Sequence, residues 1–292
     1  MNNPFVGTGT ALVTPFNKDL SIDFDSLSKL TEYQIDSGVD ILVVQGTTGE
    51  SPTLSFQEKL QVLKSVQDVN NGRRQIVFGV GGNDTVGVGK LLKELPTGID
   101  GILSVSPYYN KPTQRGIIEH YKHVAGSTDL PIILYNVPGR TGSNMSADTT
   151  LALAKIPNIV AMKEASGDFS QIMKLVQDKP EGFDVLSGDD AITFPLICTG
   201  VSGVISVVSN AFPALFSQMV AAARAGEVVK AKEIHYKLLE ITHMFFAEGN
   251  PGGVKVALNE MGIMGTTMRQ PLYPVSDELE SNIRQATKSI LS

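Results

Sequence analysis

Cysteine is nearly absent from this sequence. Cys198 is the only one in 292 residues, so no disulfide can form within the chain. It stands in the apolar stretch TFPLICTG, where we expect a buried hydrophobic side chain rather than a catalytic thiol. The N-terminal stretch MNNPFVGTG has no basic segment followed by an apolar run, so we expect no signal peptide. Both absences favour a cytoplasmic location.

Long runs of positive charge are also missing. The chain has 24 Lys and Arg against 30 Asp and Glu, which argues against nucleic acid or an anionic membrane surface as a partner. Residues 191–223 carry no charge and are long enough for a membrane span. However, Pro195, Gly200 and Pro213 divide them, so we interpret the stretch as helix, buried strand and helix.

The phosphate-binding patterns GxGxxG and GxxxxGK[ST] do not occur, which disfavours a doubly wound open sheet. What the sequence does have is eight short Val/Ile-rich runs that alternate with helical patterns. The runs are apolar nearly throughout, which is typical of parallel strands covered on both faces. They lie at 10–16, 40–46, 75–81, 101–107, 131–137, 159–165, 183–189 and 203–209.

Eight strand–helix units predict an α/β fold, a (β/α)8 TIM barrel, over residues 1–225. The doubly wound sheet is the alternative. After Ala225 the pattern is helical at 227–247, 251–261 and 277–290, which is too much for the eighth barrel helix alone. We therefore expect residues 226–292 to form an appended C-terminal helical segment packed on the barrel.

Polar residues gather where the predicted strands end, which is where TIM barrels carry their chemistry. The opposite strand ends show no comparable density. The residues are Thr47, Thr48, Glu50 and Ser51 after the second strand, Asn83 after the third, Tyr108 and Tyr109 after the fourth, Tyr135, Asn136 and Arg140 at the fifth, Lys163 and Glu164 in the sixth, and SGDD at the seventh.

Lys163 interrupts an apolar strand, although a lysine is rarely buried unless it is paired or functional. Side chains alternate along a strand, so Ala161 and Lys163 share a face, and the small Ala161 leaves room for Lys163 inside the barrel. Removal from water favours the neutral amine, which attacks carbonyl carbons to form Schiff bases. The alternative is a buried ion pair, although the neighbouring Glu164 points to the other face. Position alone leaves both open.

Schiff-base chemistry needs groups that move protons. His120 and His123 lie on a predicted helix, where we expect a solvated face and no metal because no third ligand follows. The other two histidines are in the C-terminal segment. Tyrosines and threonines at the strand ends remain as proton carriers, and Tyr135 and Tyr109 both fall there, although a tyrosine also fits a core or an interface.

Anion-binding groups are available at the same strand ends. Arg140, in a glycine-bounded loop, has the fork geometry that suits a carboxylate, although it could equally be solvated. Thr47 and Thr48, in a glycine-flanked turn, offer hydroxyl and backbone N–H groups to a second anion. The residues together predict a site that condenses small acidic carbonyl compounds.

Eight motifs carry a resemblance that spans nearly the whole chain. The sequence resembles the dihydrodipicolinate (4-hydroxy-tetrahydrodipicolinate) synthase family of the pyruvate-dependent class I aldolase superfamily, which includes N-acetylneuraminate lyase. The motifs are GTALVTPF, GTTGESPTL, SPYYNKPTQRG, YNVPGRTG, MKEASGD, SGDD, GVISV and NPGGVKVALNEMG.

The resemblance implies that pyruvate condenses with L-aspartate-4-semialdehyde, in lysine and diaminopimelate biosynthesis, without a metal or organic cofactor. It assigns the Schiff base to Lys163 and proton transfer at that centre to Tyr135. Thr47 would link Tyr135 to Tyr109 in a relay, and Tyr109 would reach the site of a neighbouring subunit. The implied assembly is a homotetramer built from dimers.

The resemblance also assigns substrate binding. It places Thr48 on the pyruvate carboxylate, Gly188 and Ile205 along the pocket, and Arg140 on the carboxylate of the semialdehyde. Arg140 favours the synthase over the neuraminate lyase, which typically lacks this arginine. The alternative is another Schiff-base pyruvate aldolase that acts on a different oxo-acid, and a non-catalytic sensor of oxo-acids is a third possibility.

Many members of the family are inhibited by lysine bound in a cleft between subunits. Lysine-sensitive bacterial members typically have histidines at the positions of Phe56 and Lys59, and a glutamate at that of Gly87. The missing acid and the added positive charge predict weak or absent lysine feedback, so the cleft would be vestigial. The matching positions are Ser51, Pro52, Phe56, Lys59, Asn83, Gly87 and Tyr108.

Overall fold

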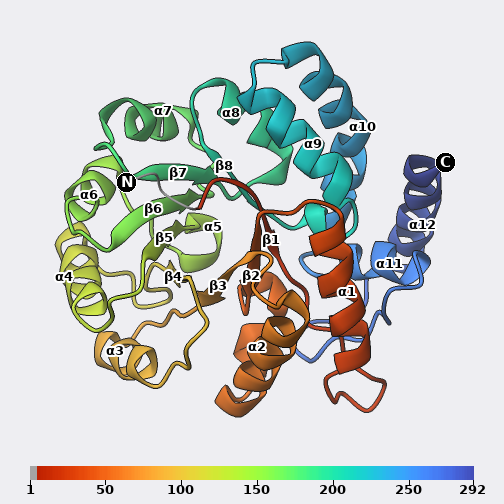
Figure 1. The fold of residues 1–292 in the computed structure, drawn as a ribbon, viewed down its shortest axis with the longest axis horizontal. Coiled ribbons are helices and arrows are strands. Elements are labelled where there is room, and N and C mark those ends of the chain that lie inside the picture. Colours follow the sequence, from red (N-terminus) through yellow and green to blue (C-terminus); the bar gives the residue numbers. More distant parts are fainter. Residues whose placement is uncertain (1–4) are drawn as a thin grey trace.

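A computed structural model describes residues 5–292. Residues 1–4, at the start of the stretch for which we expect no signal peptide, lie outside the described part. Eight parallel strands close into a barrel in chain order, β1 to β8, so the TIM-barrel prediction is confirmed (Figure 1). The strands are β1 Gly7–Ala11, β2 Ile41–Val44, β3 Gln75–Gly79, β4 Gly101–Val105, β5 Ile132–Asn136, β6 Ile159–Glu164, β7 Asp184–Ser187 and β8 Gly203–Ser206.

The strands are apolar on both faces because both faces are covered. Inward-facing side chains such as Val43, Ile133 and Ala161 fill the barrel interior, and Phe5 packs with them. Outward-facing ones such as Leu134 and Met162 pack into a larger cluster beneath the surrounding helices. A filled interior leaves the carboxyl ends of the strands as the place where polar side chains can gather.

Helices cover the outside of the barrel. Local signals set their starts: Ser55 and Glu58 form a reciprocal capping box at α2, and Asp168 caps α7. The helices are α1 Phe24–Asp36, α2 Phe56–Asn70, α3 Thr85–Lys93, α4 Gln114–Ala125, α5 Pro138–Thr141, α6 Ala147–Leu153, α7 Phe169–Asp178, α8 Thr193–Cys198 and α9 Pro213–Arg224, with short 3₁₀ turns η1 Thr47–Gly49, η2 Ser51–Thr53, η3 Asp190–Ile192 and η4 Val208–Asn210.

The C-terminal segment forms α10 Val228–Phe246, α11 Gly252–Glu260 and α12 Asp277–Leu291, each within one residue of its prediction. α10 packs on α9 and α12, and α11 packs on α12. These blue helices lie on the side of the barrel where α1 and α9 are found (Figure 1). Lys29 of α1 donates to the Gly262 carbonyl at 2.6 Å, which ties the segment to the barrel. The division at residue 225 stays a prediction.

Three sequence expectations were wrong. The first strand begins at Gly7 and ends at Ala11, and not at 10–16, because pairing with β2 and β8 outweighs the weak strand preference of GTGTA. Cys198 is exposed, because it is the last residue of a short helix. His120 is buried and its Nδ1 lies 2.9 Å from the Thr85 hydroxyl, because that face of α4 meets α3.

Residues 191–223 contain α8, β8 and α9, as interpreted from the sequence. Within residues 5–292, no helix is both long and apolar enough to cross a membrane.

Candidate active site

Lys163 lies at the carboxyl end of β6 with its side chain in the barrel, and only 6% of the residue is exposed. Its ammonium nitrogen is 4.3 Å from the centroid of the Tyr135 ring. Strand register sets this contact, because Tyr135 of β5 is paired with Lys163. Across the described residues no carboxylate lies within ion-pair distance of Lys163, so the buried ion pair that the sequence left open is not formed there.

The acidic neighbour Glu164 faces away from Lys163, as expected from strand alternation. Its carboxylate accepts hydrogen bonds from the Asn136 amide at 3.0 Å and the Ser166 N–H at 2.8 Å. Burial raises the pKa of Glu164, and these donors partly oppose the shift. Glu164 therefore links the ends of β5 and β6 through hydrogen bonds and does not pair with the Lys163 amine.

A cavity of about 270 Å³ surrounds Lys163 at the strand ends. It brings together five residues predicted from the sequence, which come from β5 or from the turns that follow β2, β5 and β7. They are Thr47, Thr48, Tyr135, Arg140 and Gly188. Ile205, whose backbone is expected along the pocket, does not line this cavity, and its side chain lies in the barrel interior.

Gly188 leaves the space that the lysine side chain occupies. A Cβ atom at this position would lie 3.0 Å from Cε of Lys163 and 2.8 Å from Cβ of Ala165. The Gly188 N–H donates to the Glu164 carbonyl at 2.8 Å, which fixes the end of β7 against β6. A larger residue would have to displace the lysine or the strand end.

The turn after β2 presents both threonines. Thr47 and Thr48 begin η1, and the Thr14 hydroxyl donates to the Gly49 carbonyl at 2.7 Å, which closes the turn on the end of β1. The Asn250 amide donates to the Thr48 hydroxyl oxygen at 3.0 Å. The turn is therefore held from β1 on one side and from the C-terminal segment on the other.

Arg140 is exposed in the short helix α5, whose first turn is closed by its N–H on the Val137 carbonyl at 2.9 Å. Tyr109 is 87% exposed and its backbone is left-handed, with φ 72°. In the described residues no hydrogen bond joins Thr47 to Tyr135 or Tyr109, so the proton relay stays a prediction. Tyr109 does not line the Lys163 cavity of its own chain.

A second cavity of about 330 Å³ shares Thr47, Tyr135 and Arg140 with the first. Four residues of the predicted effector cleft line it: Ser51, Pro52, Lys59 and Tyr108. Burial lowers the pKa of Lys59. The lining residues of this cavity include no aspartate or glutamate.

The other three cleft residues lie nearby but outside that lining. Asn83 donates to the Tyr108 carbonyl at 3.1 Å, Phe56 begins α2, and Gly87 lies in α3. A Cβ atom at Gly87 would lie 2.7 Å from a carboxylate oxygen of Asp84, the residue that caps this helix. The structure thus groups most, and not all, of the predicted cleft around one cavity.

Two residues that line the Lys163 cavity come from the C-terminal segment and were given no role from the sequence: Phe246 and Asn250. Asn250 is 7% exposed, and its Oδ1 atom has no hydrogen-bond partner within the described chain. It opens the motif NPGGVK, which carried part of the resemblance, but its distance from the strand ends in sequence concealed its place. No group of His, Cys, Asp or Glu that could hold a metal is found in residues 5–292.

Behind the cavity, Asp190 is fully enclosed. One of its oxygens accepts the Val207 N–H at 2.9 Å and the Val208 N–H at 3.3 Å, which ties the turn after β7 to the end of β8. Burial raises the pKa of Asp190 to about 6.

The chain is similar to known proteins over nearly its whole length. The model of the dihydrodipicolinate synthetase family matches residues 4–290. The chain belongs to this family. A 4-hydroxy-tetrahydrodipicolinate synthase of Flavobacterium psychrophilum is 50% identical over 291 residues, with 98% of each chain covered.

Two solved structures of the family are similar over 99% of each chain. Dihydrodipicolinate synthase from Thermotoga maritima is 41% identical and superposes with a TM-score of 0.96. The enzyme from Cyanidioschyzon merolae, solved with lysine bound, is 36% identical with a TM-score of 0.94. The family, the fold and the class of enzyme predicted from the sequence are thus confirmed.

Proposed function

We propose that this chain is a lyase that condenses pyruvate with L-aspartate-4-semialdehyde to give 4-hydroxy-tetrahydrodipicolinate, in lysine and diaminopimelate biosynthesis. The observation that carries the proposal is Lys163, a buried lysine without a carboxylate partner among the described residues, in the lining of a cavity that also holds Thr48 and Arg140. An unpaired amine between two anion-binding groups is what a reaction between two acidic carbonyl compounds requires.

The lysine amine attacks the ketone carbon of pyruvate and water leaves, which gives an imine. Loss of a methyl proton then gives an enamine, whose carbon attacks the aldehyde carbon of the second substrate. The amino group of that substrate closes the ring and displaces Lys163, so the enzyme is regenerated. Tyr135, whose ring lies beside the lysine nitrogen, would pass the protons, and Thr47 and Tyr109 would extend the relay.

Different residues would bind the carboxylates of the two substrates. Thr48, together with backbone N–H groups of its turn, would bind the pyruvate carboxylate, and Gly188 leaves room beside it. Arg140, which lines the cavity from α5, would bind the semialdehyde carboxylate through its guanidinium.

We also propose a homotetramer built from dimers, in which the exposed Tyr109 would complete the relay of a neighbouring subunit. Sedimentation should show an oligomer, and a fully active monomer would overturn the shared relay. The single cysteine supports the cytoplasmic location proposed from the sequence.

A coupled assay with pyruvate and aspartate-semialdehyde tests the function, on wild type and on Arg140→Ala. We expect turnover by wild type, and a KM for the semialdehyde raised at least about tenfold in the variant, because a charge-assisted contact is lost. Turnover of pyruvate with another aldehyde but not with aspartate-semialdehyde would contradict the proposal.

A further inference from the structure

The clearest feature outside the catalytic cavity is a buried ion pair between α11 and the turn after β2. Lys255 and Glu50 both have fully buried side chains, and their charged atoms are 2.5 Å apart. Glu50 directly follows η1, the turn that carries Thr47 and Thr48, and its backbone is left-handed with φ 55°. An ion pair therefore joins the C-terminal segment to the turn that faces Lys163.

The ammonium group of Lys255 has all three of its hydrogen-bonding positions filled. Besides Glu50, it donates to the Thr14 carbonyl at 2.9 Å and to the Thr267 carbonyl at 2.8 Å. It also lies 4.7 Å from the centroid of the Phe16 ring. The Thr14 hydroxyl also donates to the Gly49 carbonyl at the end of η1. The Lys255 ammonium therefore binds both Thr14 and Glu50, the two residues that hold the end of this turn.

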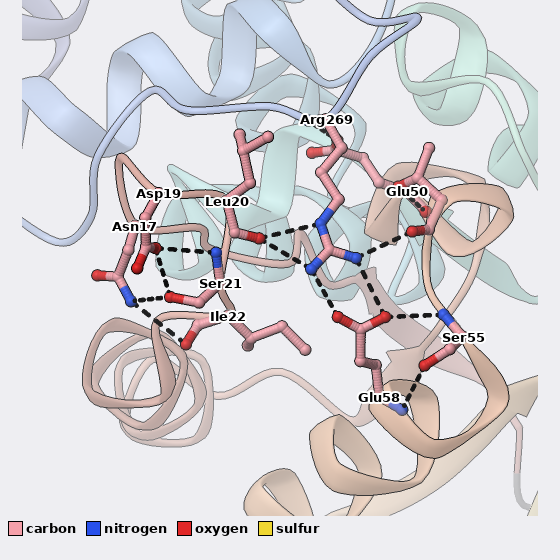
Figure 2. A network of polar contacts seen from close by, with 10 residues as sticks. Asn17, Asp19, Leu20, Ser21, Ile22, Glu50, Ser55, Glu58 and Arg269 are labelled. Carbon is pink, nitrogen blue, oxygen red and sulfur yellow. Dashed lines mark hydrogen bonds and ion pairs between the residues drawn. The ribbon is translucent and has the colours of Figure 1, made fainter.

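Glu50 is held on its other side as well. Its second carboxylate oxygen accepts the Arg269 N–H at 3.1 Å. The Arg269 guanidinium binds the Glu58 carboxylate at 2.6 Å and the Leu20 carbonyl at 2.8 Å, and Figure 2 shows it lying between these groups with Glu50 beside it. Residues 255–269 therefore bind the chain at both 3₁₀ turns that follow β2, η1 and η2.

Burial alone does not explain this arrangement. Two charges removed from water cost free energy that their attraction barely offsets, so apolar side chains would hold the two segments together at least as well. An ion pair with fixed hydrogen bonds also sets how the two segments are oriented relative to each other. Burial lowers the pKa of Lys255, and the Glu50 carboxylate opposes that shift.

We propose that Glu50 and Lys255 are positioning residues that hold the Thr47–Thr48 turn in the geometry that binds the pyruvate carboxylate. The inference rests on the proposed function, because Thr48 must be the pyruvate contact. It assigns the C-terminal segment a part in the reaction, through a contact made outside the barrel. Arg140 belongs to a different element, α5, and none of these contacts reaches it.

The test compares Lys255→Met, Glu50→Gln and the double variant Glu50→Gln/Lys255→Met by steady-state kinetics and thermal unfolding. In Lys255→Met the carboxylate stays buried without its partner, so this variant should unfold at a lower temperature than wild type. The double variant leaves no unpaired charge, so its unfolding midpoint should lie above that of Lys255→Met. Its kcat/KM for pyruvate should nevertheless fall by about 10- to 100-fold, because the turn is misplaced.

The decisive readout is the split between substrates. In the double variant and in Glu50→Gln we expect a raised KM for pyruvate and an unchanged KM for aspartate-semialdehyde. A matched control is Glu260→Gln/Arg284→Met, because that 2.9 Å ion pair joins the same helix α11 to α12 away from the turn. It should lower the unfolding midpoint without changing either KM.

A wild-type KM for pyruvate in the folded double variant, or in Glu50→Gln should the double variant not fold, would overturn the inference. So would an equal rise in both KM values. The proposed function is checked separately by borohydride trapping of pyruvate on wild type. If wild type forms no adduct, the function fails; if it does and the KM values are unchanged, only the positioning role fails.

Discussion

The ammonium nitrogen of Lys163 lies 4.3 Å from the centre of the Tyr135 ring, and the two residues are paired in register on adjacent strands. The backbone positions of both residues are fixed by their strands, which are buried nearly throughout. The contact between the Lys163 amine and the Tyr135 ring is therefore positioned by the strands of the barrel and not by a loop.

The first prediction follows from that contact. Tyr135→Phe keeps the ring beside Lys163 but removes the hydroxyl that would pass protons. We expect kcat to fall by at least about 100-fold while the unfolding midpoint hardly changes, because a positioned proton carrier is worth that much. A steady-state assay and a thermal melt measure the two effects.

The control for Tyr135→Phe is Tyr121→Phe. Tyr121 is also buried, but its hydroxyl donates to the Ser104 carbonyl at 2.8 Å and does not line the Lys163 cavity. This variant should lose about 1 kcal/mol of stability and keep its kcat. Equal kcat values for the two variants would refute the role of Tyr135.

A second prediction concerns the space beside Lys163. Gly188→Ala would press a methyl group on Cε of Lys163, at 3.0 Å, and on Ala165. We expect kcat to fall by about 10- to 100-fold, because the amine is displaced, and stability to fall by about 1–3 kcal/mol from overpacking. Gly265→Ala, where an added Cβ meets nothing closer than 3.9 Å, is the control. Unchanged kcat in Gly188→Ala would show that the lysine does not need this space.

The third prediction is a pH dependence of stability. The pKa of Asp190 is about 6 in the fold and 3.8 as its ordinary value, so between these pH values the folded state binds more protons. The free energy of unfolding should therefore fall as pH rises from about 4 to 6, by about 3 kcal/mol at most.

The Asp190 contribution is isolated by comparison with Asp190→Asn. This variant keeps an acceptor for the Val207 N–H but cannot ionise. Denaturant unfolding at several pH values should show wild type losing stability relative to the variant as pH rises through this range. The same slope in both proteins would mean that Asp190 is not the group that titrates. Because burial lowers the pKa of His120 to about 4, its contribution has the opposite sign and is removed by the same comparison.

The fourth prediction is insensitivity to lysine. The cavity that holds four residues of the predicted effector cleft is lined by Lys59 and Arg140 and by no carboxylate, so the ammonium groups of lysine would meet like charge there. Activity should be unchanged when lysine is added to the assay. Half-inhibition at a sub-millimolar lysine concentration would refute this.

Particular residues show how much of the site could be predicted from the sequence. Lys163, Tyr135 and Thr48 could be predicted because each is a polar residue at the end of an apolar run, and parallel strands bring their carboxyl ends together. His120 and Cys198 could not, because burial on a helix depends on which face its neighbours cover. Asn250 and Lys255 contact the turn after β2 from the C-terminal segment, and nothing local to their sequence specifies that docking.

The most direct test of the account is borohydride reduction in the presence of pyruvate, followed by peptide mass mapping. We expect wild type to gain the mass of one reduced pyruvate adduct, located on Lys163, and Lys163→Ala to gain none while it stays folded. An adduct on another lysine, or no adduct on wild type, would contradict the central claim that this buried amine forms the Schiff base.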